Sequence, residues 1–178
     1  FYAPFFGREN EANKTFTGIE TAYQEARALA KKATRKPSAL SGALYKDVWY
    51  LPAGDSWAAQ FLEDAGANYL WKETPGTGSL SLSVEAVLER GRDAAIWVSP
   101  SQYTGYAEMA EGSRHYSQFR AFEEKKVYTF ARTKGPTGGL LYYELAPAKP
   151  HEVLLDLIAI FHPELLPERE LYFFKPLE

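Results

Sequence analysis

One long stretch, residues 10–33, constrains this chain more than any other, because it has the pattern of a single uninterrupted helix. At 1.5 Å per residue such a helix is about 36 Å long, close to the width of a domain of this size. Apolar residues recur at steps of four and three along one face, as in an amphipathic helix. They are Ala12, Phe16, Ile19, Tyr23, Ala26, Ala30 and Ala33.

Four of these seven positions are alanine, which makes a thin seam for a free coiled coil. A helix that pairs with another copy is therefore one interpretation, and packing onto the domain that follows is the favoured one. We expect Ala26, Ala30 and Ala33 to allow close approach to that domain. The first turns, around Ala12 and Phe16, should be more exposed or covered by another part of the protein.

Composition limits the classes of function. The chain has 178 residues, of which 46% are hydrophobic, so it can bury one sizeable core. Its net charge of −3 gives no support to nucleic-acid binding. It has no cysteine, and its three histidines are scattered, so the sequence predicts neither a metal site nor a resident cofactor. No apolar run is long enough to span a membrane.

After the long helix, strand-like and helix-like segments alternate, which predicts a doubly wound α/β fold in three layers around a mostly parallel sheet. Strands are expected within 39–44, 48–51, 69–71, 94–98 and 127–130. Helices are expected from Trp57 to Ala65, from Ser83 to Gly91, more weakly over 106–119, and from Pro150 to Phe161. Asp55 or Ser56 should cap the first of these, whose inner face would be formed by Trp57, Ala58, Phe61, Leu62 and Ala65.

In such sheets, ligands lie beyond the carboxyl ends of the strands. The loops expected there, 51–57, 72–81, 99–106 and 129–139, are rich in aromatic, hydroxyl and glycine residues and poor in carboxylates. This composition favours stacking and neutral hydrogen bonds over acid–base catalysis. Tyr142 and Tyr143 are equally explained as core and edge aromatics or as ligand contacts. A small hydrolase with Ser56 as nucleophile is an alternative, but no histidine lies in these loops to serve as its base.

The order of segments resembles the C-terminal lobe of class III periplasmic substrate-binding proteins, the components of ABC importers for iron–siderophores, haem and vitamin B12. The resemblance rests on the segments Trp49–Trp57, Phe61–Ala67, Gly78–Val87, Asp93–Val98, Tyr116–Tyr128 and Leu154–Glu164, and it covers nearly the whole chain from Gly7. In this family two α/β lobes are joined by one long helix, and the ligand is held between them.

The resemblance implies that residues 1–34 are the tail of a missing N-terminal lobe and the connecting helix, and that residues 35–178 are the ligand-binding lobe. Partners would be a small-molecule or metal-chelate ligand, an ABC permease and the missing lobe, with a periplasmic location and a lipid anchor at a lost N-terminus.

No catalytic residue is implied. The ligand contacts would be stacking or pairing by Trp57, Tyr103 and Arg132, and hydrogen bonding by Ser56, Thr77 and Ser79. Glu85 matches the family's acidic residue that docks on the permease, although a first-turn carboxylate is as well explained by the helix dipole.

Overall fold

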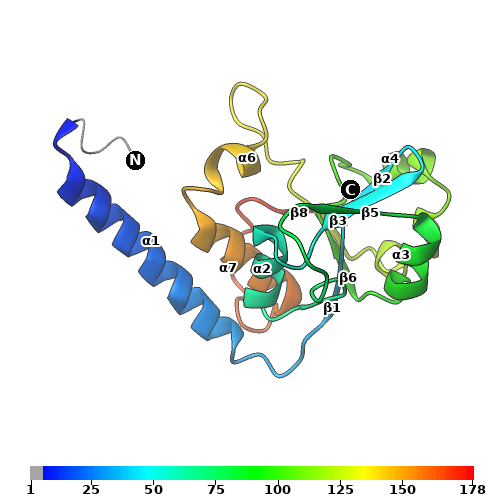
Figure 1. Cartoon of the computed structure of the whole chain (residues 1–178), viewed down its shortest axis with the longest axis horizontal. Helices are drawn as coiled ribbons and strands as arrows, with labels where there is room; N and C mark the ends of the chain where they lie inside the picture. The colour runs from blue at the N-terminus through cyan, green and yellow to red at the C-terminus, as the bar shows by residue number, and fades with distance from the viewer. Residues whose placement is uncertain (1–5) are drawn as a thin grey trace.

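The computed structural model describes residues 6–178, so residues 1–5 of the expected tail and connecting helix at 1–34 lie outside the described residues. A five-stranded sheet carries the fold (Figure 1). Its strands, in spatial order, are β4 (Asn68–Tyr69), β1 (Ser38–Ser41), β6 (Ile96–Val98), β7 (Val127–Thr129) and β8 (Lys175–Pro176). The first four are parallel, and β8 pairs antiparallel with β7.

Helices cover both faces of this sheet (Figure 1). On one face lie α2 (Trp57–Asp64), α6 (Leu141–Leu145) and α7 (Pro150–Phe161), and on the other lie α3 (Val84–Gly91), α4 (Tyr106–Gly112) and α5 (Arg120–Glu123). The chain leaves β1 toward β4 and then returns past β1 to β6 and β7, which puts successive crossovers on opposite faces. The expected doubly wound, three-layer α/β class is confirmed.

A second, antiparallel sheet corrects the sequence-based picture. It consists of β2 (Ala43–Tyr45), β3 (Val48–Pro52) and β5 (Ser79–Leu82), with β3 in the middle. The strand expected at 48–51 exists but belongs to this sheet, and the end of the loop expected at 72–81 is β5. Lys46, at φ +56°, makes the tight turn between β2 and β3. Trp49 is fully buried, and its indole N–H donates to the Ser41 carbonyl at 3.1 Å, so the second sheet is fixed against the first.

The long helix α1 (Glu9–Ala30) is attached through its C-terminal half. Ala26 and Ala30 are buried where α1 packs on α7. The Tyr23 hydroxyl donates to Asp64 Oδ2 at 2.8 Å, and Arg27 pairs with the same carboxylate at 2.9 Å. These contacts confirm that the alanine-rich part packs on its own domain. The helix ends three residues earlier than expected, in a tightened turn where Lys32 N–H reaches the Leu29 carbonyl.

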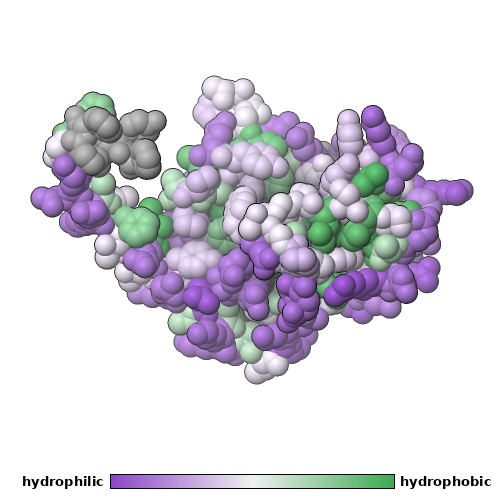
Figure 2. Space-filling model, in the orientation of Figure 1, coloured by the Kyte–Doolittle hydropathy of each residue, from purple (hydrophilic) through white to green (hydrophobic). Residues whose placement is uncertain are grey.

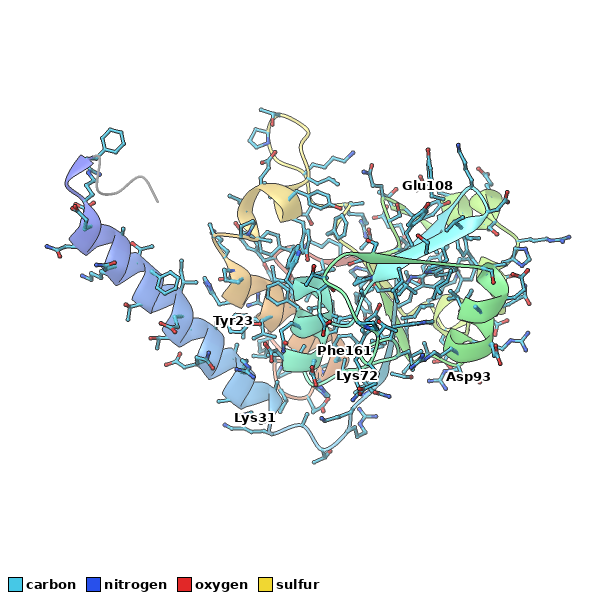
Figure 3. All side chains as sticks on the ribbon, in the orientation of Figure 1. Tyr23, Lys31, Lys72, Asp93, Glu108 and Phe161 are labelled. Carbon is cyan, nitrogen blue, oxygen red and sulfur yellow. The ribbon has the colours of Figure 1, made fainter. Side chains whose placement is uncertain are left out.

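The N-terminal half of α1 stands clear of the domain, as Figure 3 shows. Phe16 is 68% exposed on the apolar stripe. An apolar groove of about 360 Å³ runs between the middle of α1 and α2, where Figure 2 shows a hollow beside the helix. It is lined by Phe16, Ile19, Glu20, Tyr23, Gln24, Trp57, Gln60, Phe61 and Pro150. The expectation that the first turns are the more exposed ones is confirmed.

Serine hydroxyls mark the starts of α2 and α3. Ser56 Oγ accepts the Ala59 N–H at 3.2 Å, and Ser83 Oγ accepts the Ala86 N–H at 3.3 Å, so both hydroxyls are N-caps. Trp57 departs from the expected inner face of α2, since it is 57% exposed. The weaker helix expected at 106–119 is broken into α4, a 3₁₀ turn (Tyr116–Gln118) and α5, because Ser113 is extended at φ −164°.

The end of the chain is held by one buried carboxylate. Asp156 on α7 is fully buried and accepts backbone N–H groups from Tyr172, Phe173 and Phe174 at 2.6–3.1 Å. Arg169 donates to the same carboxylate at 2.7 Å. This network fixes the two buried phenylalanines beneath the sheet edge and leads the chain into β8.

Candidate ligand-binding groove

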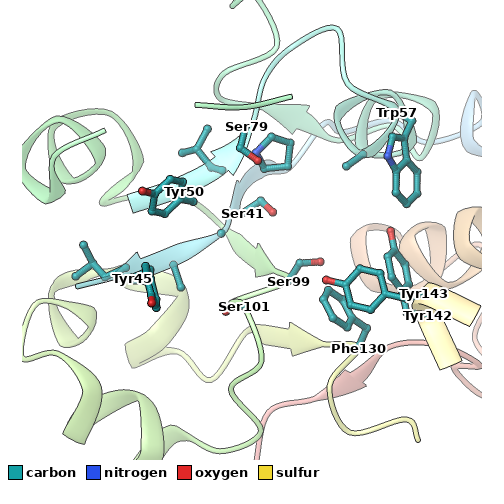
Figure 4. A pocket seen from close by; sticks show the side chains of 16 residues that line it. Ser41, Tyr45, Tyr50, Trp57, Ser79, Ser99, Ser101, Phe130, Tyr142 and Tyr143 are labelled. Atoms are coloured by element: carbon teal, nitrogen blue, oxygen red, sulfur yellow. The ribbon is translucent and has the colours of Figure 1, made fainter. Parts of the chain in front are cut away.

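The reversal of strand order places a crevice at the carboxyl ends of β1 and β6, because the loops after these strands run to opposite faces. A groove of about 280 Å³ opens at this point (Figure 4). The second sheet forms one side, and α2 with α6 forms the other. Its lining consists of Ser41, Gly42, Ala43, Leu44, Tyr45, Tyr50, Leu51, Pro52, Trp57, Ala58, Ser79, Ser99, Ser101, Phe130, Tyr142 and Tyr143.

The backbone at the crevice is unusual at three positions. Gly42, at φ +79°, donates its N–H to the Ser99 carbonyl at 3.2 Å, and a Cβ there would lie 1.8 Å from the Tyr50 carbonyl oxygen. Ser99 and Ser101 are left-handed at φ +56° and +54°, although neither is glycine. Such conformations cost about 1–3 kcal/mol each and gather at functional sites. Their position beside the groove makes this crevice the leading candidate site.

One wall is a ladder of aromatic rings. Tyr142 is stacked between Phe130, at a centroid distance of 4.7 Å, and Trp57, at 6.0 Å, with interplanar angles of 14° and 19°. Tyr143 packs edge-on against Phe130 and is 61% exposed. Burial raises the pKa of the Tyr142 and Tyr143 phenols above the ordinary value, so both remain protonated at neutral pH and can donate hydrogen bonds.

Tyr45 and Tyr50 stand on the opposite side, 68% and 42% exposed, and Ser41 and Ser99 point into the space between the two walls (Figure 4). No aspartate, glutamate, lysine, arginine or histidine lines the groove among the described residues. Flat aromatic faces with neutral hydroxyls can hold a bulky ligand by stacking and hydrogen bonding.

Comparison with known proteins decides the family. Residues 3–132 match the family model described as "Periplasmic binding protein", which is well over half of the chain. The chain belongs to the periplasmic binding protein family. The class III resemblance of its sequence is thereby confirmed.

Relatives and solved structures agree with this family. An uncharacterized lipoprotein of Methanocaldococcus jannaschii is 28% identical over 176 residues, which is 97% of this chain and 40% of the relative. A second protein of that organism is 21% identical and covered to 48%, so the chain spans less than half of these curated relatives.

The periplasmic heme-binding protein RhuT from Roseiflexus superposes with a TM-score of 0.70 at 16% identity, over 92% of this chain and 60% of that one. IsdE of Staphylococcus aureus, complexed with heme, gives a TM-score of 0.63 at 16% identity, over 90% and 60%. At these identities the structural likeness shows the fold.

Within this periplasmic binding protein, two of the six residues expected to contact a ligand line the groove. They are Trp57, from the first turn of α2, and Ser79, from the start of β5. Thr77 is exposed in the loop before β5 and lies outside the lining.

The other three expected ligand contacts make bonds within the protein. Ser56 is 4% exposed, and its hydroxyl caps α2. Tyr103 packs edge-on against Tyr116 at 5.7 Å. Arg132 donates to the Pro176 carbonyl at 2.6 Å and pairs with Glu178. The capping bond of Ser56, together with the lack of histidine in the lining, gives no support to the hydrolase alternative. The family and its structural neighbours are binding proteins.

Sequence reasoning missed part of the lining. Tyr45 and Tyr50 escaped notice because they belong to the second sheet, whose pairing is not evident from local patterns. Ser41 was hidden within a strand-like run, although the glycine after it is a recognisable signal for a close backbone approach. Tyr142 and Tyr143, left open between core and ligand contact, both line the groove.

Glu85 lies elsewhere, in the exposed first turn of α3. It borders a polar hollow of about 490 Å³ together with Lys46, Asp47, Arg114 and His115. Figure 1 shows α3 on the opposite side of the second sheet from α2 and α6.

Two further findings concern membranes and metals. Within residues 6–178, no helix combines the length and apolar character needed to cross a bilayer. The same residues contain no cluster of three or more His, Asp or Glu side chains arranged to hold a metal ion.

Proposed function

We propose that this chain is the ligand-binding C-terminal lobe of the solute-binding component of an ABC importer. Its ligand is a ferric siderophore, cobalamin or a haem-like chelate. The observation that carries the proposal is the groove at the switch point, where an aromatic ladder, the exposed Tyr45 and Tyr50, and four serines meet. Family membership supports a binding role.

The domain arrangement forms part of the proposal. Residues 1–34 include the connecting helix and the tail of an N-terminal lobe, and residues 35–178 form the C-terminal lobe. The exposed apolar stripe around Phe16 and the groove beside it support a second lobe packed there. The ligand would then be held between two walls, of which this chain supplies one.

We assign docking on the permease to Glu85, an exposed carboxylate remote from the ligand groove. The protein would work outside the cytoplasm, held by a lipid anchor. The name of the lipoprotein relative in M. jannaschii supports an anchored form. No chemical step on the ligand is part of this function.

Binding can be tested by titrating the protein with ferric siderophores, cobalamin and haem while tryptophan fluorescence is followed. Trp57 is the exposed tryptophan of the described residues, whereas Trp49, Trp71 and Trp97 are at most 3% exposed. We expect saturable quenching by one ligand class, with a smaller change in Trp57→Phe, in which Trp49 and Trp97 still report from beside the groove through their bonds to the Ser41 and Gly42 carbonyls. Absence of quenching by all of them would remove this class of ligand.

Docking can be tested separately with permease reconstituted in vesicles. Glu85→Lys should abolish stimulation of ATP hydrolysis while leaving ligand affinity unchanged. Glu89→Lys makes a matched control, since it adds the same charge one turn further along α3. Equal stimulation by the Glu85 variant and the control would refute this docking role.

A further inference from the structure

A single residue joins the two sheets where the ligand groove opens. β1, in the first sheet, ends at Ser41, and β2, in the second sheet, begins at Ala43, so Gly42 alone lies between them. The second sheet carries Tyr45 and Tyr50 on one side of the groove, whereas α2 and α6, on the other side, pack on the first sheet. The angle of the chain at Gly42 therefore sets the separation between the two walls.

The backbone on both sides of Gly42 is held by hydrogen bonds. The Gly42 N–H donates to the Ser99 carbonyl at 3.2 Å. The Gly42 carbonyl accepts the indole N–H of Trp97 at 2.9 Å, and the Ser41 carbonyl accepts that of Trp49 at 3.1 Å. Both peptide groups that flank the bend thus have partners within the protein.

A buried tyrosine holds the edge of the second sheet in a similar way. β2 is an edge strand, because β3 lies in the middle of its sheet and β5 is at the other edge. The Leu44 N–H of β2 donates to the Tyr116 hydroxyl at 3.0 Å. Tyr116 comes from the 3₁₀ turn after α4, so it belongs to neither sheet. Because a partly buried N–H is destabilising without an acceptor, this bond restrains the position of β2.

The three side chains that make these bonds form one cluster. Trp49 and Trp97 are stacked at a centroid distance of 5.2 Å, and Tyr116 packs edge-on against them at 5.8 and 5.5 Å. All three are fully buried, and none belongs to the described lining of the groove. Close packing fixes such rings and hence their polar tips. The cluster can therefore act on a ligand only through the backbone that it bonds.

We propose that Tyr116 and Trp97 are positioning residues of the ligand groove, an inference that rests on the proposed function. By bonding Leu44 and Gly42, they fix the hinge between the two sheets, so the groove has its width before a ligand arrives. A wall fixed in this way loses little conformational freedom on binding, which favours affinity.

The separation of the two walls can be measured directly with spin labels, because the chain has no cysteine of its own. Asp47→Cys, at the exposed tip of the β2–β3 turn, and Ala148→Cys, between α6 and α7, provide the two labelling sites. Tyr116→Phe removes one oxygen, and Trp97→Phe removes the indole N–H but keeps a ring. We expect each to broaden the distance distribution by about twofold, since a hinge with an unpaired amide or carbonyl samples more angles.

Tyr106→Phe is the matched control. The Tyr106 hydroxyl accepts the Val127 N–H at 3.2 Å, so this variant also deprives a strand of a bond to a tyrosine, at a residue outside the groove lining. The urea midpoint should fall by similar amounts in Tyr116→Phe and Tyr106→Phe, whereas the distance distribution should broaden only in Tyr116→Phe. Equal broadening in both, or none in Tyr116→Phe, overturns the positioning role.

Binding is measured in the same variants with haem, cyanocobalamin and a ferric trihydroxamate as probes. For a probe that the native chain binds, Tyr116→Phe should weaken affinity by about fivefold, and Tyr106→Phe should leave it within about twofold of the native value. Unchanged affinity in Tyr116→Phe overturns the positioning role and leaves the binding function standing. Binding of none of the probes by the native chain overturns the proposed function and the positioning role with it, whereas the fixed hinge is still decided by the distance measurement.

Discussion

Asp156 and Arg169 form an ion pair in which the carboxylate is completely buried and the guanidinium is 16% exposed, with Nη2 and Oδ1 2.7 Å apart. Removing one partner of such a pair leaves a buried charge uncompensated, at a cost of about 3–5 kcal/mol. Asp156→Ala should therefore lower the free energy of unfolding by that amount, as measured by urea denaturation. Glu152→Gln alters a more exposed partner of Arg169 and should cost under about 1 kcal/mol. Equal losses in the two variants would contradict this assignment.

Gly42 should tolerate no side chain. Its φ of +79° and the Tyr50 carbonyl 1.8 Å from a Cβ mean that Gly42→Ala must shift β3. We expect a loss of about 2–4 kcal/mol and weaker ligand binding, measured by urea unfolding and by titration. Gly78→Ala is the control, since a Cβ there meets nothing within 4 Å. If Gly42→Ala left the free energy of unfolding unchanged, the close approach of Gly42 to the Tyr50 carbonyl would not be needed to maintain the crevice.

Trp57 should matter for binding and only moderately for stability. Because the ring is 57% exposed but packs against Phe61 and Tyr142, Trp57→Ala should lower the free energy of unfolding by about 1–2 kcal/mol. Loss of its stacking face should weaken ligand affinity by about tenfold. Calorimetric titration of the variant checks the affinity, and an unchanged dissociation constant would remove Trp57 from the site.

Stability should decline in alkali. The pKa of Tyr142 is raised by burial, so the folded state holds this proton above pH about 10, where the unfolded phenol ionises. The contribution is therefore fully present below pH about 10 and is lost as pH rises further. Urea midpoints at about pH 9 and about pH 11 should differ less in Tyr142→Phe than in the native chain. Tyr45→Phe, at a residue 68% exposed, should keep the native difference.

Much of the fold could be predicted because its signals are local. Ser56 and Ser83 cap their helices, and Pro150 opens α7, each through contacts within one turn. The unbroken apolar run at 94–98 indicated a buried parallel strand, and β6 is buried throughout. The spacing of the α1 stripe correctly predicted which half of that helix is exposed.

What could not be predicted depends on distant partners. The strand β5 has the sequence Ser-Leu-Ser-Leu, whose serines resemble a loop until β3 pairs with it. The pairing of β2 with β3 brings Tyr45 and Tyr50 to the groove. Arg132 was expected to contact a ligand because its partner, Glu178, is 46 residues away in sequence. The two residues meet because Asp156 fixes residues 172–174, which lead the end of the chain into β8. Candidate site residues are thus harder to infer than elements, since neighbours from remote segments decide which side chains remain available.

The hydrogen bond between the Gly42 N–H and the Ser99 carbonyl has a consequence for the order of folding. It joins the ends of two strands that are separated in sequence by the whole second sheet and by α2 and α3. Closing so large a loop is slow relative to forming local helices, so the crevice should be among the last parts to assemble. A molecule bound across the crevice would then bind the fully folded state and not partly folded ones. Its binding would stabilise the native state against global unfolding.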